Sequence, residues 1–392
     1  MASRLLRGLS IAAGTALLFG CAAQRISYEP GEPCRAATFT VTDNFHGARR
    51  GHCTVVSDNH VEVLIRPEDE GKINNSAWYA FRIEPAAVGP ARVTLRYEGG
   101  NHRYWPKTSL DAASWRRLDQ AAVTASRDGL SARIEIDLHD GPVWIAAQEL
   151  VTPEHYAAWN AGMANATGVP LRELGKSRNG LPIHVFDSNA ESTEVLLMIG
   201  RQHPPEVSGA FAFFAFTETI FGDSTLAVAF RDRFRIIAIP LMNPDGVVAG
   251  NWRHNTGHLD INRDWGPFTQ PETKLVADLL EELDAGGYRL RMFIDFHSTD
   301  KNIFYTQQEP TDPPGFTRRW LENAAPRIEN YPFSNGEGPV KNPAVAKNYI
   351  YSRYGIPAVT FEAGDETDRD AVRNAARIFA EELMRLMLSE EY

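Results

Sequence analysis

The sequence predicts a chain of the α/β class, in which an all-β sandwich precedes a mixed, doubly wound sheet flanked by helices. A chain of 392 residues exceeds the usual size of one domain, so two domains are the default expectation. Residues 22–150 contain short strand-like runs, whereas strand-like and helical segments alternate through residues 151–392. We therefore place the domain boundary between residues 150 and 151.

Alternation of apolar and polar residues marks four strands of the predicted sandwich. The runs cover residues 60–66, 78–83, 91–97 and 132–137, and clusters such as Glu98-Gly99-Gly100-Asn101 separate them. Short alternating strands between turn signals are typical of a β-sandwich. The tryptophans of this part could form a binding face, but aromatic residues in strands lie more often in the core.

The second part begins with a helix-start signal, in which Thr152 is the expected N-cap and Pro153 the first helical residue. Strands that alternate with helices of ten or more residues predict a largely parallel or mixed sheet covered on both faces. Ligands of such sheets bind beyond the carboxyl ends of the strands. The predicted strands are 181–187, 194–200, 234–240, 290–296 and 357–362, and the predicted helices are 153–165, 207–221, 271–284, 316–329 and 367–388.

The first 21 residues have the build of an export signal. Arg4 and Arg7 precede an apolar run over residues 9–19, which small residues and Cys21 follow. The run is too short to span a bilayer, because spanning takes ~20 apolar residues. Residues 18–21 resemble a bacterial lipobox, in which the cysteine becomes lipidated. We therefore expect a periplasmic protein anchored to the outer membrane through Cys21, with an unprocessed N-terminal helix as the alternative.

The remaining cysteines and the charge add two constraints. Cys34 and Cys53 form one even pair, which could close a loop in an oxidising compartment or stay as two reduced thiols. The net charge is −10 and no long basic run occurs, so the sequence has no footprint for nucleic-acid binding.

Two short motifs follow predicted buried strands of the second part. His203-Pro204-Pro205-Glu206 comes after the apolar run 195–200, and Asp295-Phe296-His297 comes after 292–294. Two strands would thus deliver two histidines and a glutamate to one edge of the sheet. Three protein ligands with one open position are the pattern of a catalytic zinc. A single histidine in a loop is more often a surface or core residue, so the metal hypothesis depends on the residues that accompany it.

Further motifs occur between and after the two histidines. They are Asn243-Pro244-Asp245, Asn251-Trp252-Arg253-His254-Asn255, Asp260-Ile261-Asn262-Arg263 and Phe361-Glu362. In these residues the sequence resembles the zinc carboxypeptidases of the carboxypeptidase A superfamily. The matching segments run in the family's order through residues 170–390, and the Asp-Ile-Asn-Arg motif is specific.

The resemblance implies one Zn²⁺ per chain, held by His203, Glu206 and His297. Glu362 would be the general base, which takes a proton from the attacking water and passes it to the leaving amine. Arg253 would stabilise the oxyanion that develops from the scissile carbonyl.

A clamp for the substrate's terminal carboxylate would make the protein an exopeptidase. The resemblance assigns this clamp to Asn262 and to Arg263, whose planar fork suits a carboxylate. Asp260 would hydrogen-bond the free ring nitrogen of His203 and so fix its tautomer. Arg253 and Arg263 could instead be ordinary salt-bridge partners of the acidic surface.

Other polar residues near these motifs receive structural interpretations. His254 and His258 are expected on the surface or in the pocket wall rather than at a metal. We expect Asp295 to point to the sheet face opposite His297 and to serve the structure alone. Asp245 is expected to form a turn.

One departure from the family concerns a tyrosine that digestive members carry upstream of the catalytic glutamate. Residues 339–341, at the corresponding distance from Glu362, include no tyrosine. The nearby candidates are Tyr331, Tyr349 and Tyr351, and the sequence leaves open which residue takes this role; Tyr349 is assigned to substrate binding, as part of the pocket wall. Three basic residues close to it would favour an acidic substrate side chain if they face inward: Lys341, Lys347 and Arg353.

The architecture narrows the resemblance to a subgroup. A β-sandwich with the strand motif Trp78-Tyr79-Ala80-Phe81-Arg82, placed directly before the catalytic domain, is similar to the cytosolic carboxypeptidases, which trim glutamates from protein tails in eukaryotes. The export signal conflicts with a cytosolic role, so the architecture is carried over and the substrate is not.

The sequence thus predicts an exported zinc metallocarboxypeptidase that removes C-terminal residues from peptides with a free carboxylate. Peptidoglycan-derived peptides are one expected substrate class. Two alternatives are a zinc-dependent amide deacylase of the same superfamily and a catalytically inactive protein that binds the cell envelope. The complete Asp-Ile-Asn-Arg motif and the full-size sandwich disfavour the deacylase. The joint presence of ligands, base and clamp disfavours the binding protein.

Overall fold

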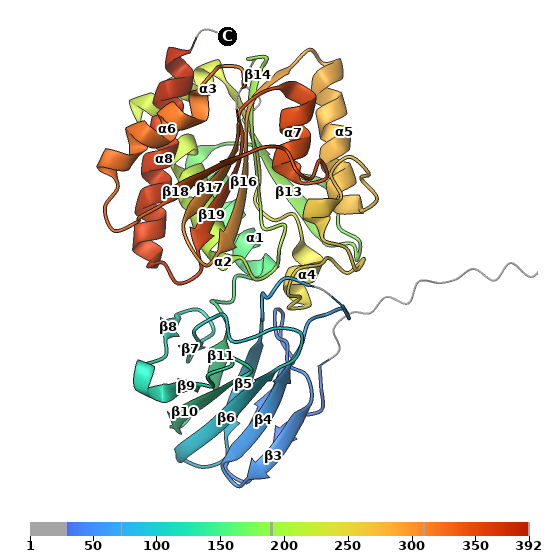
Figure 1. Ribbon diagram of the computed structural model, residues 1–392, viewed down its shortest axis with the longest axis vertical. Helices are drawn as coiled ribbons and strands as arrows, with labels where there is room; N and C mark the ends of the chain where they lie inside the picture. The colour runs from blue at the N-terminus through green and yellow to red at the C-terminus, as the bar shows by residue number, and fades with distance from the viewer. Residues whose placement is uncertain (1–29, 72, 189–190, 309, 391–392) are drawn as a thin grey trace, which may run out of the picture.

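The computed structural model describes residues 30–71, 73–188, 191–308 and 310–390 (Figure 1). The predicted export signal, its lipobox and Cys21 lie outside the described residues. Within those ranges, no single helix is long and apolar enough to cross a membrane. The helices α2 (Val207–Phe221) and α3 (Thr225–Arg233) meet that criterion only as a pair bent by 86°.

Two sheets packed face to face form the N-terminal part of the chain, as predicted (Figure 1). Burial alternates along β6 and β10, and their inward residues share one hydrophobic cluster with Phe81 and Ile145 of the other sheet. The sheet orders are β1-β2-β5-β11-β7-β8 and β3-β4-β6-β10-β9. The strands are β1 (Cys34–Arg35), β2 (Phe39–Thr42), β3 (Cys53–Ser57), β4 (His60–Ile65), β5 (Ala80–Pro85), β6 (Gly89–Tyr97), β7 (Lys107–Ser109), β8 (Arg116–Arg117), β9 (Val123–Ala125), β10 (Ser131–Leu138) and β11 (Val143–Ala146).

A disulfide joins the two sheets of the sandwich. It links Cys34 of β1 with Cys53 of β3, so the two cysteines form a pair rather than two reduced thiols. Disulfides form and persist in oxidising compartments, where they restrict the unfolded chain.

An eight-stranded mixed sheet organises the rest of the chain, in the order β12-β13-β15-β14-β16-β19-β17-β18. The four central strands run parallel, and β13 and β17 pair antiparallel with the outer two of them. Parallel strands buried on both faces consist of nearly continuous apolar residues, and this is the pattern of the central strands. The strands are β12 (Leu171–Lys176), β13 (Pro182–Asp187), β14 (Glu194–Gly200), β15 (Arg235–Ile239), β16 (Arg289–Thr299), β17 (Ile303–Gln307), β18 (Ser334–Gly338) and β19 (Ala358–Gly364).

Helices cover both faces of this sheet (Figure 1). One face shares a hydrophobic cluster with α2, α3, α6 and α8, and the other shares a second cluster with α5 and α7. This part of the chain is therefore doubly wound, as predicted. Besides α2 and α3, the helices are α1 (Pro153–Thr167), α4 (Pro244–Val248), α5 (Pro271–Ala285), α6 (Phe316–Ala324), α7 (Ala346–Tyr354) and α8 (Arg369–Ser389).

Most predicted boundaries lie close to the observed ones, and the differences have physical causes. The helix predicted for 316–329 ends at Ala324, because Pro326 has no N–H to continue it, and a 3₁₀ turn follows. β16 and β19 continue beyond their predicted ends, so His297 lies within a strand rather than after it, and Glu362 is no longer the last residue of its strand. In this part of the chain α3, α4, α7, β12, β17 and β18 were not predicted, and the expectation of a turn at Asp245 is wrong, because Asp245 lies in the first turn of α4.

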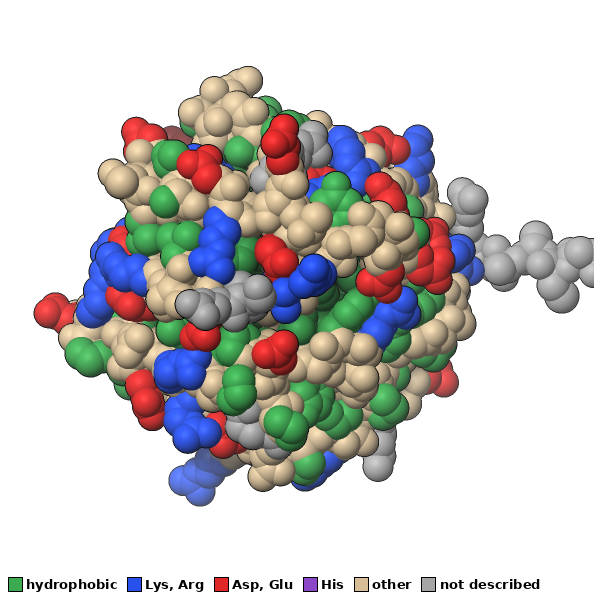
Figure 2. Space-filling model, turned by 90° about the horizontal axis from the view of Figure 1, so that it is seen from above, with side chains coloured by type: hydrophobic (Ala, Val, Ile, Leu, Met, Phe, Trp, Pro, Cys, Tyr) green, Lys and Arg blue, Asp and Glu red, His purple; other side chains and the backbone are tan. Residues whose placement is uncertain are grey.

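Acidic and basic side chains are interspersed on the end of the molecule that lies opposite the sandwich (Figure 2). This face therefore offers no continuous basic track for a phosphate backbone. The predicted lack of nucleic-acid binding stays a prediction.

Candidate active site

Three parallel strands bring the predicted site residues to one edge of the main sheet. β14 ends at Gly200, and the turn that follows leads through His203 to Glu206, the N-cap of α2. His297 lies near the end of β16, which pairs in parallel with β14 and β19. Parallel strands place their carboxyl ends at the same edge, so residues from distant segments meet there.

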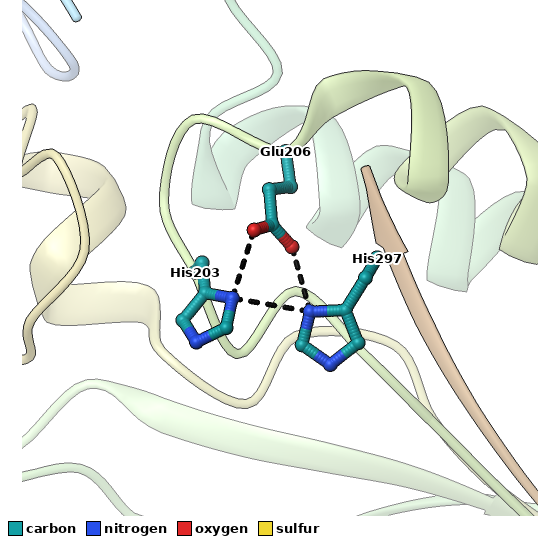
Figure 3. A group of neighbouring side chains, drawn as sticks. All are labelled: His203, Glu206 and His297. Atoms are coloured by element: carbon teal, nitrogen blue, oxygen red, sulfur yellow. Dashed lines mark hydrogen bonds and ion pairs between the residues drawn. The ribbon is translucent and has the colours of Figure 1, made fainter. Parts of the chain in front are cut away.

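His203, Glu206 and His297 form a compact group of potential metal ligands (Figure 3). The Nδ1 atoms of the two histidines lie 3.1 Å apart. Glu206 places Oε1 2.8 Å from Nδ1 of His203 and Oε2 2.7 Å from Nδ1 of His297. All three side chains are buried, so these donor atoms converge on one small volume.

Each of the two imidazoles also contacts a carboxylate through its other ring nitrogen. Nε2 of His203 lies 3.0 Å from Oδ1 of Asp260, which is the predicted contact. Nε2 of His297 lies 2.8 Å from Oδ2 of Asp295, so the expectation that Asp295 points away from His297 is wrong. The two residues are two positions apart on β16, and alternate residues of a strand share a face. The Asp-x-His spacing on a strand was the signal for this contact.

The protonation of the two imidazole rings favours a cation between the three side chains. A carboxylate only accepts hydrogen bonds, so a carboxylate at each Nε2 favours the tautomer that carries its proton there. Each Nδ1 then presents a lone pair to Glu206 and to the other imidazole. Acceptors this close to one another are stable only with a positive charge between them, which either a metal ion or a proton on an imidazole supplies. Two imidazole nitrogens and a carboxylate are a donor set for zinc that leaves room for a further ligand, so the residues fit Zn²⁺.

The charges of the group shift its ionisation. Burial alone would raise the pKa of Glu206, but His203 and His297 outweigh burial and hold that pKa well below its usual range. Burial alone would lower the pKa of His297, whereas Asp295 and Glu206 raise it well above its usual value. Glu206 is therefore kept ionised, which is the form that a metal ligand requires.

Glu362 lies beside His297 on the neighbouring strand. The two residues are paired in the parallel register of β16 and β19, so their side chains project from the same face of the sheet. Oε2 of Glu362 is buried and has no hydrogen-bond partner among the residues that the structure describes. Burial raises the pKa of this carboxyl, and the charge of Glu206 adds to the rise. A carboxyl of this kind beside metal ligands is suited to proton transfer.

Arg253 belongs to a buried network rather than to a surface salt bridge. Its Nε donates to Oδ2 of Asp260 at 2.6 Å, while Oδ1 of the same carboxylate contacts His203. Burial opposes ionisation of Asp260, but the charges of His203 and Arg253 lower its pKa far below the usual range. Asp260 therefore links the guanidinium of Arg253 to one of the ligands.

The two residues predicted for the carboxylate clamp lie in different environments. Asn262 is buried: its Oδ1 accepts a hydrogen bond from the backbone N–H of Ala346 at 2.9 Å, and its Nδ2 lies 3.3 Å from Nε2 of His297. Arg263 keeps 44% of its side chain exposed and donates to the backbone oxygen of Asn262 at 2.7 Å. The exposed fork of Arg263 is therefore the part of this pair that a substrate can reach.

Comparison with known proteins decides the family. Residues 159–379, more than half of the chain, match the model of zinc carboxypeptidases. The chain belongs to the zinc carboxypeptidase family. A metallo-carboxypeptidase from Burkholderia cenocepacia has the same fold as this carboxypeptidase, with a TM-score of 0.74 and 20% identity over 89% of this chain and 98% of that one.

Two relatives match this carboxypeptidase over very different shares of their own length. An uncharacterized protein of Zymomonas mobilis is 23% identical over 80% of this chain and 85% of its own length. Cytosolic carboxypeptidase 2 of Xenopus tropicalis is 29% identical over 34% of this chain, which matches only 15% of that protein.

Family membership confirms the resemblance and the fold class predicted from the motifs. The protein is a zinc carboxypeptidase hydrolase with an N-terminal sheet domain, and neither a deacylase nor an inactive binding protein is favoured. The family also implies a zinc ion, for which the buried group of two histidines and a glutamate is the candidate site.

Of the three basic residues predicted near the side-chain pocket of this carboxypeptidase, only Lys347 is buried. Lys341 is exposed, and Arg353 is exposed and pairs with Asp284 at 2.7 Å. Lys347 is 8% exposed and lies in the first turn of α7, next to the residue that Asn262 contacts. Its side chain therefore faces inward, and its backbone lies close to Asn262 of the predicted clamp.

The ammonium group of Lys347 lies among neutral oxygens. Nζ is 2.9 Å from Oδ1 of Asn348 and 3.5 Å from the backbone oxygen of Thr306 on β17. Across the described ranges, no carboxylate lies within ion-pair distance of Lys347. Burial lowers the pKa of its ammonium to about 8.

Tyr349 has contacts that favour a packing role. Its ring lies 5.1 Å from that of Phe268 and 6.1 Å from that of Trp265, measured between centroids. Its hydroxyl accepts a hydrogen bond from Arg353 at 3.0 Å. The substrate-binding role assigned to Tyr349 stays a prediction.

We expect Gly209→Ala to open the ligand group. At Gly209, α2 crosses β16 so closely that an added Cβ would lie 2.4 Å from the backbone oxygen of His297. The methyl group would push α2 away from β16 and so separate Glu206 from His297. The expected result is weaker zinc binding and a loss of about 1–3 kcal/mol in the free energy of unfolding. Zinc competition with a chelator and urea denaturation measure these two effects.

Gly162→Ala on α1 is the matched control, because a Cβ there meets no atom within 4 Å. Zinc affinity that is equal in the two variants would show that the close approach of α2 to β16 does not set the ligand geometry.

Proposed function

We propose that this zinc carboxypeptidase removes single residues from the C-termini of peptides, with Glu362 as the general base. The register of β16 and β19 carries the proposal, because it sets an unpartnered carboxyl oxygen beside His297 and the other two ligands. The chemistry that Zn²⁺ supplies when bound is Lewis acidity, which lowers the pKa of water to ~7.

The protein's own groups divide the remaining work. Glu362 accepts a proton from the attacking water and returns it to the leaving amine. Arg253, which Asp260 holds in place, donates hydrogen bonds to the carbonyl oxygen of the substrate as negative charge develops there. Arg263, with Asn262 beside it, binds the terminal carboxylate. Binding at the terminal carboxylate restricts cleavage to the last peptide bond.

The preferred substrate in this proposal ends in an acidic residue. Lys347 is a buried ammonium group without a carboxylate partner among the described residues, and such a group is unfavourable until an anion pairs with it. A glutamate or aspartate side chain at the C-terminus of a peptide would supply that anion. Lys347 follows directly after Ala346, whose N–H contacts Asn262, so the backbone of Lys347 lies close to one residue of the clamp.

We also propose that the enzyme acts in the periplasm, tethered through a lipid on Cys21. The arginines, the apolar run and the small residues of the first 21 positions support export, and the disulfide between Cys34 and Cys53 suits an oxidising compartment. Peptides derived from peptidoglycan are a periplasmic substrate class that ends in a free carboxylate.

A peptide library tests the proposed function. The purified protein is expected to shorten library members by single C-terminal residues, which mass spectrometry detects. Treatment with a zinc chelator should abolish the release, and added Zn²⁺ should restore it, because metal binding is reversible. Bound zinc of less than ~0.5 equivalents per chain, together with no release from any peptide, would instead support a binding protein without catalytic activity.

A further inference from the structure

The loop that carries Arg253 is packed into the N-terminal sandwich. This loop, residues 249–255, follows α4, and its Trp252 is fully buried within the hydrophobic cluster of the sandwich. Nε1 of Trp252 donates to the backbone oxygen of Trp78 at 3.1 Å. Gly100 leaves room for the indole, since an added Cβ would lie 2.8 Å from its ring. The sandwich therefore surrounds the residue that directly precedes Arg253.

A single carboxylate of the sandwich accepts hydrogen bonds from three consecutive N–H groups of this loop. Oε2 of Glu68 accepts from the backbone N–H of Trp252 at 2.7 Å. Oε1 of Glu68 accepts from the backbone N–H groups of Arg253 and His254, at 2.9 Å and 2.6 Å. Hydrogen bonds to an ionised acceptor are the stronger kind, so Glu68 fixes the backbone on both sides of the Cα atom of Arg253.

Two other residues of the N-terminal part, Asp69 and Arg49, hold the same loop at other points. Nδ1 of His254 lies 2.5 Å from Oδ2 of Asp69, and the same carboxylate contacts His258. Nη1 of Arg49 donates to the backbone oxygen of Ala249 at 3.3 Å and to Oδ1 of Asn251 at 3.2 Å. His254 and His258 thus belong to the junction between the two parts of the chain.

A continuous set of contacts runs from the sandwich to the ligand group. Glu68 holds the backbone of Arg253, Nε of Arg253 donates to Asp260, and Asp260 contacts His203. The guanidinium of Arg253 is fixed on the catalytic side through Asp260. The location of the guanidinium also depends on the backbone of Arg253, which the sandwich holds in place.

We propose that the N-terminal sandwich is part of the active site, and that its Glu68 is a positioning residue that holds Arg253 for catalysis. The inference rests on the role proposed above for Arg253. A long side chain transmits any shift of its backbone to the guanidinium, and a displacement of ~1 Å costs ~10²-fold in rate. The sandwich thus contributes to catalysis by positioning Arg253.

Glu68→Gln tests the proposal. Both carboxylate oxygens of Glu68 accept hydrogen bonds from backbone N–H groups, and glutamine replaces one of these oxygens with an NH₂ group, which cannot accept. We expect kcat to fall about 10- to 100-fold, with an unchanged zinc content, since the ligands lie on other segments. Amide hydrogen exchange of the substrate-free protein should accelerate in the loop 249–255. Glu68→Asp keeps a carboxylate on a shorter side chain, so its kcat should lie between those of Glu68→Gln and the wild type. If Glu68→Gln does not fold, Glu68→Asp takes its place in the comparison.

Glu366→Gln is the matched control at the same junction. Glu366 pairs with Lys107 of the sandwich at 2.9 Å but does not contact the loop 249–255, so kcat and the exchange of that loop should stay at wild-type values.

A double-mutant cycle separates positioning from general stability. If Glu68 acts through Arg253, Glu68→Gln should lower kcat no further in a protein that already carries Arg253→Met. Additive losses of kcat, or unchanged exchange of the loop in Glu68→Gln, would overturn the proposal.

Two further outcomes have distinct meanings. Glu68, Asp69 and His254 lie close enough together to hold a cation, so a second equivalent of zinc that disappears in Glu68→Gln would overturn the positioning role in favour of a metal site. If the wild-type protein cleaves no peptide, the proposed function fails, and the exchange of the loop in Glu68→Gln still decides whether Glu68 holds it.

Discussion

Glu362→Gln is expected to lower kcat by about 10³-fold while the zinc stays bound, because positioned acid–base groups contribute ~10²–10⁴ in rate. Glutamine keeps the shape of the side chain but cannot accept a proton. The ligands lie on β16 and on the turn after β14, whereas Glu362 lies on β19, so the metal site should survive. Steady-state kinetics on a cleaved peptide and metal analysis of the same sample measure both effects.

Glu337→Gln controls for the loss of one negative charge, because Glu337 is an exposed residue of the edge strand β18. That variant should retain wild-type kcat. A kcat within ~10-fold of wild type in Glu362→Gln would show that another group transfers the proton.

Lys347→Gln is expected to reduce the preference for acidic C-terminal residues by about 10- to 100-fold, since a hydrogen bond to a charged group contributes ~1.5–3 kcal/mol. The measure is the ratio of kcat/KM for two peptides that differ only in a terminal Glu or Gln. Lys341→Gln, at an exposed position, is the matched control and should leave the ratio unchanged.

The same ratio should depend on pH in the wild-type enzyme. Burial lowers the pKa of Lys347 to about 8, so the charged form that binds an acidic side chain predominates below that pH and is lost above it. The preference for Glu over Gln should therefore decrease as the pH rises through about 8. A ratio that is constant across this range, or a wild-type enzyme that prefers apolar termini, would rule out Lys347 as the partner of the substrate side chain.

The sequence predicted the central sheet well because its parallel strands are continuous apolar runs between clear turn signals. The edge strand β18 and the short helix α7 escaped prediction because their residues are largely polar, and β17 escaped it because it is a run of only five residues. The same limit applied to Lys347, which could be identified as inward-facing only once α7 was placed against the central sheet.

The site residues could be predicted from motifs, but only some of the contacts between them could be predicted. The contact between Asp260 and His203 was predicted from the motif. That between Asp295 and His297 was misjudged, although strand alternation contained the information. The junction of Glu68 with the loop of Arg253 joins residues 185 positions apart, and no local pattern in the sequence indicates such a contact.

In the proposed function, the enzyme requires a free carboxylate at the end of its substrate. A matched pair of peptides, identical except that one ends in a carboxylate and the other in an amide, tests it most directly. We predict release of the terminal residue from the first peptide and a loss of at least about 10²-fold in kcat/KM for the second, because the charged fork of Arg263 loses its partner. Equal cleavage of the two peptides would contradict the proposed exopeptidase function and show that cleavage does not depend on the terminal carboxylate.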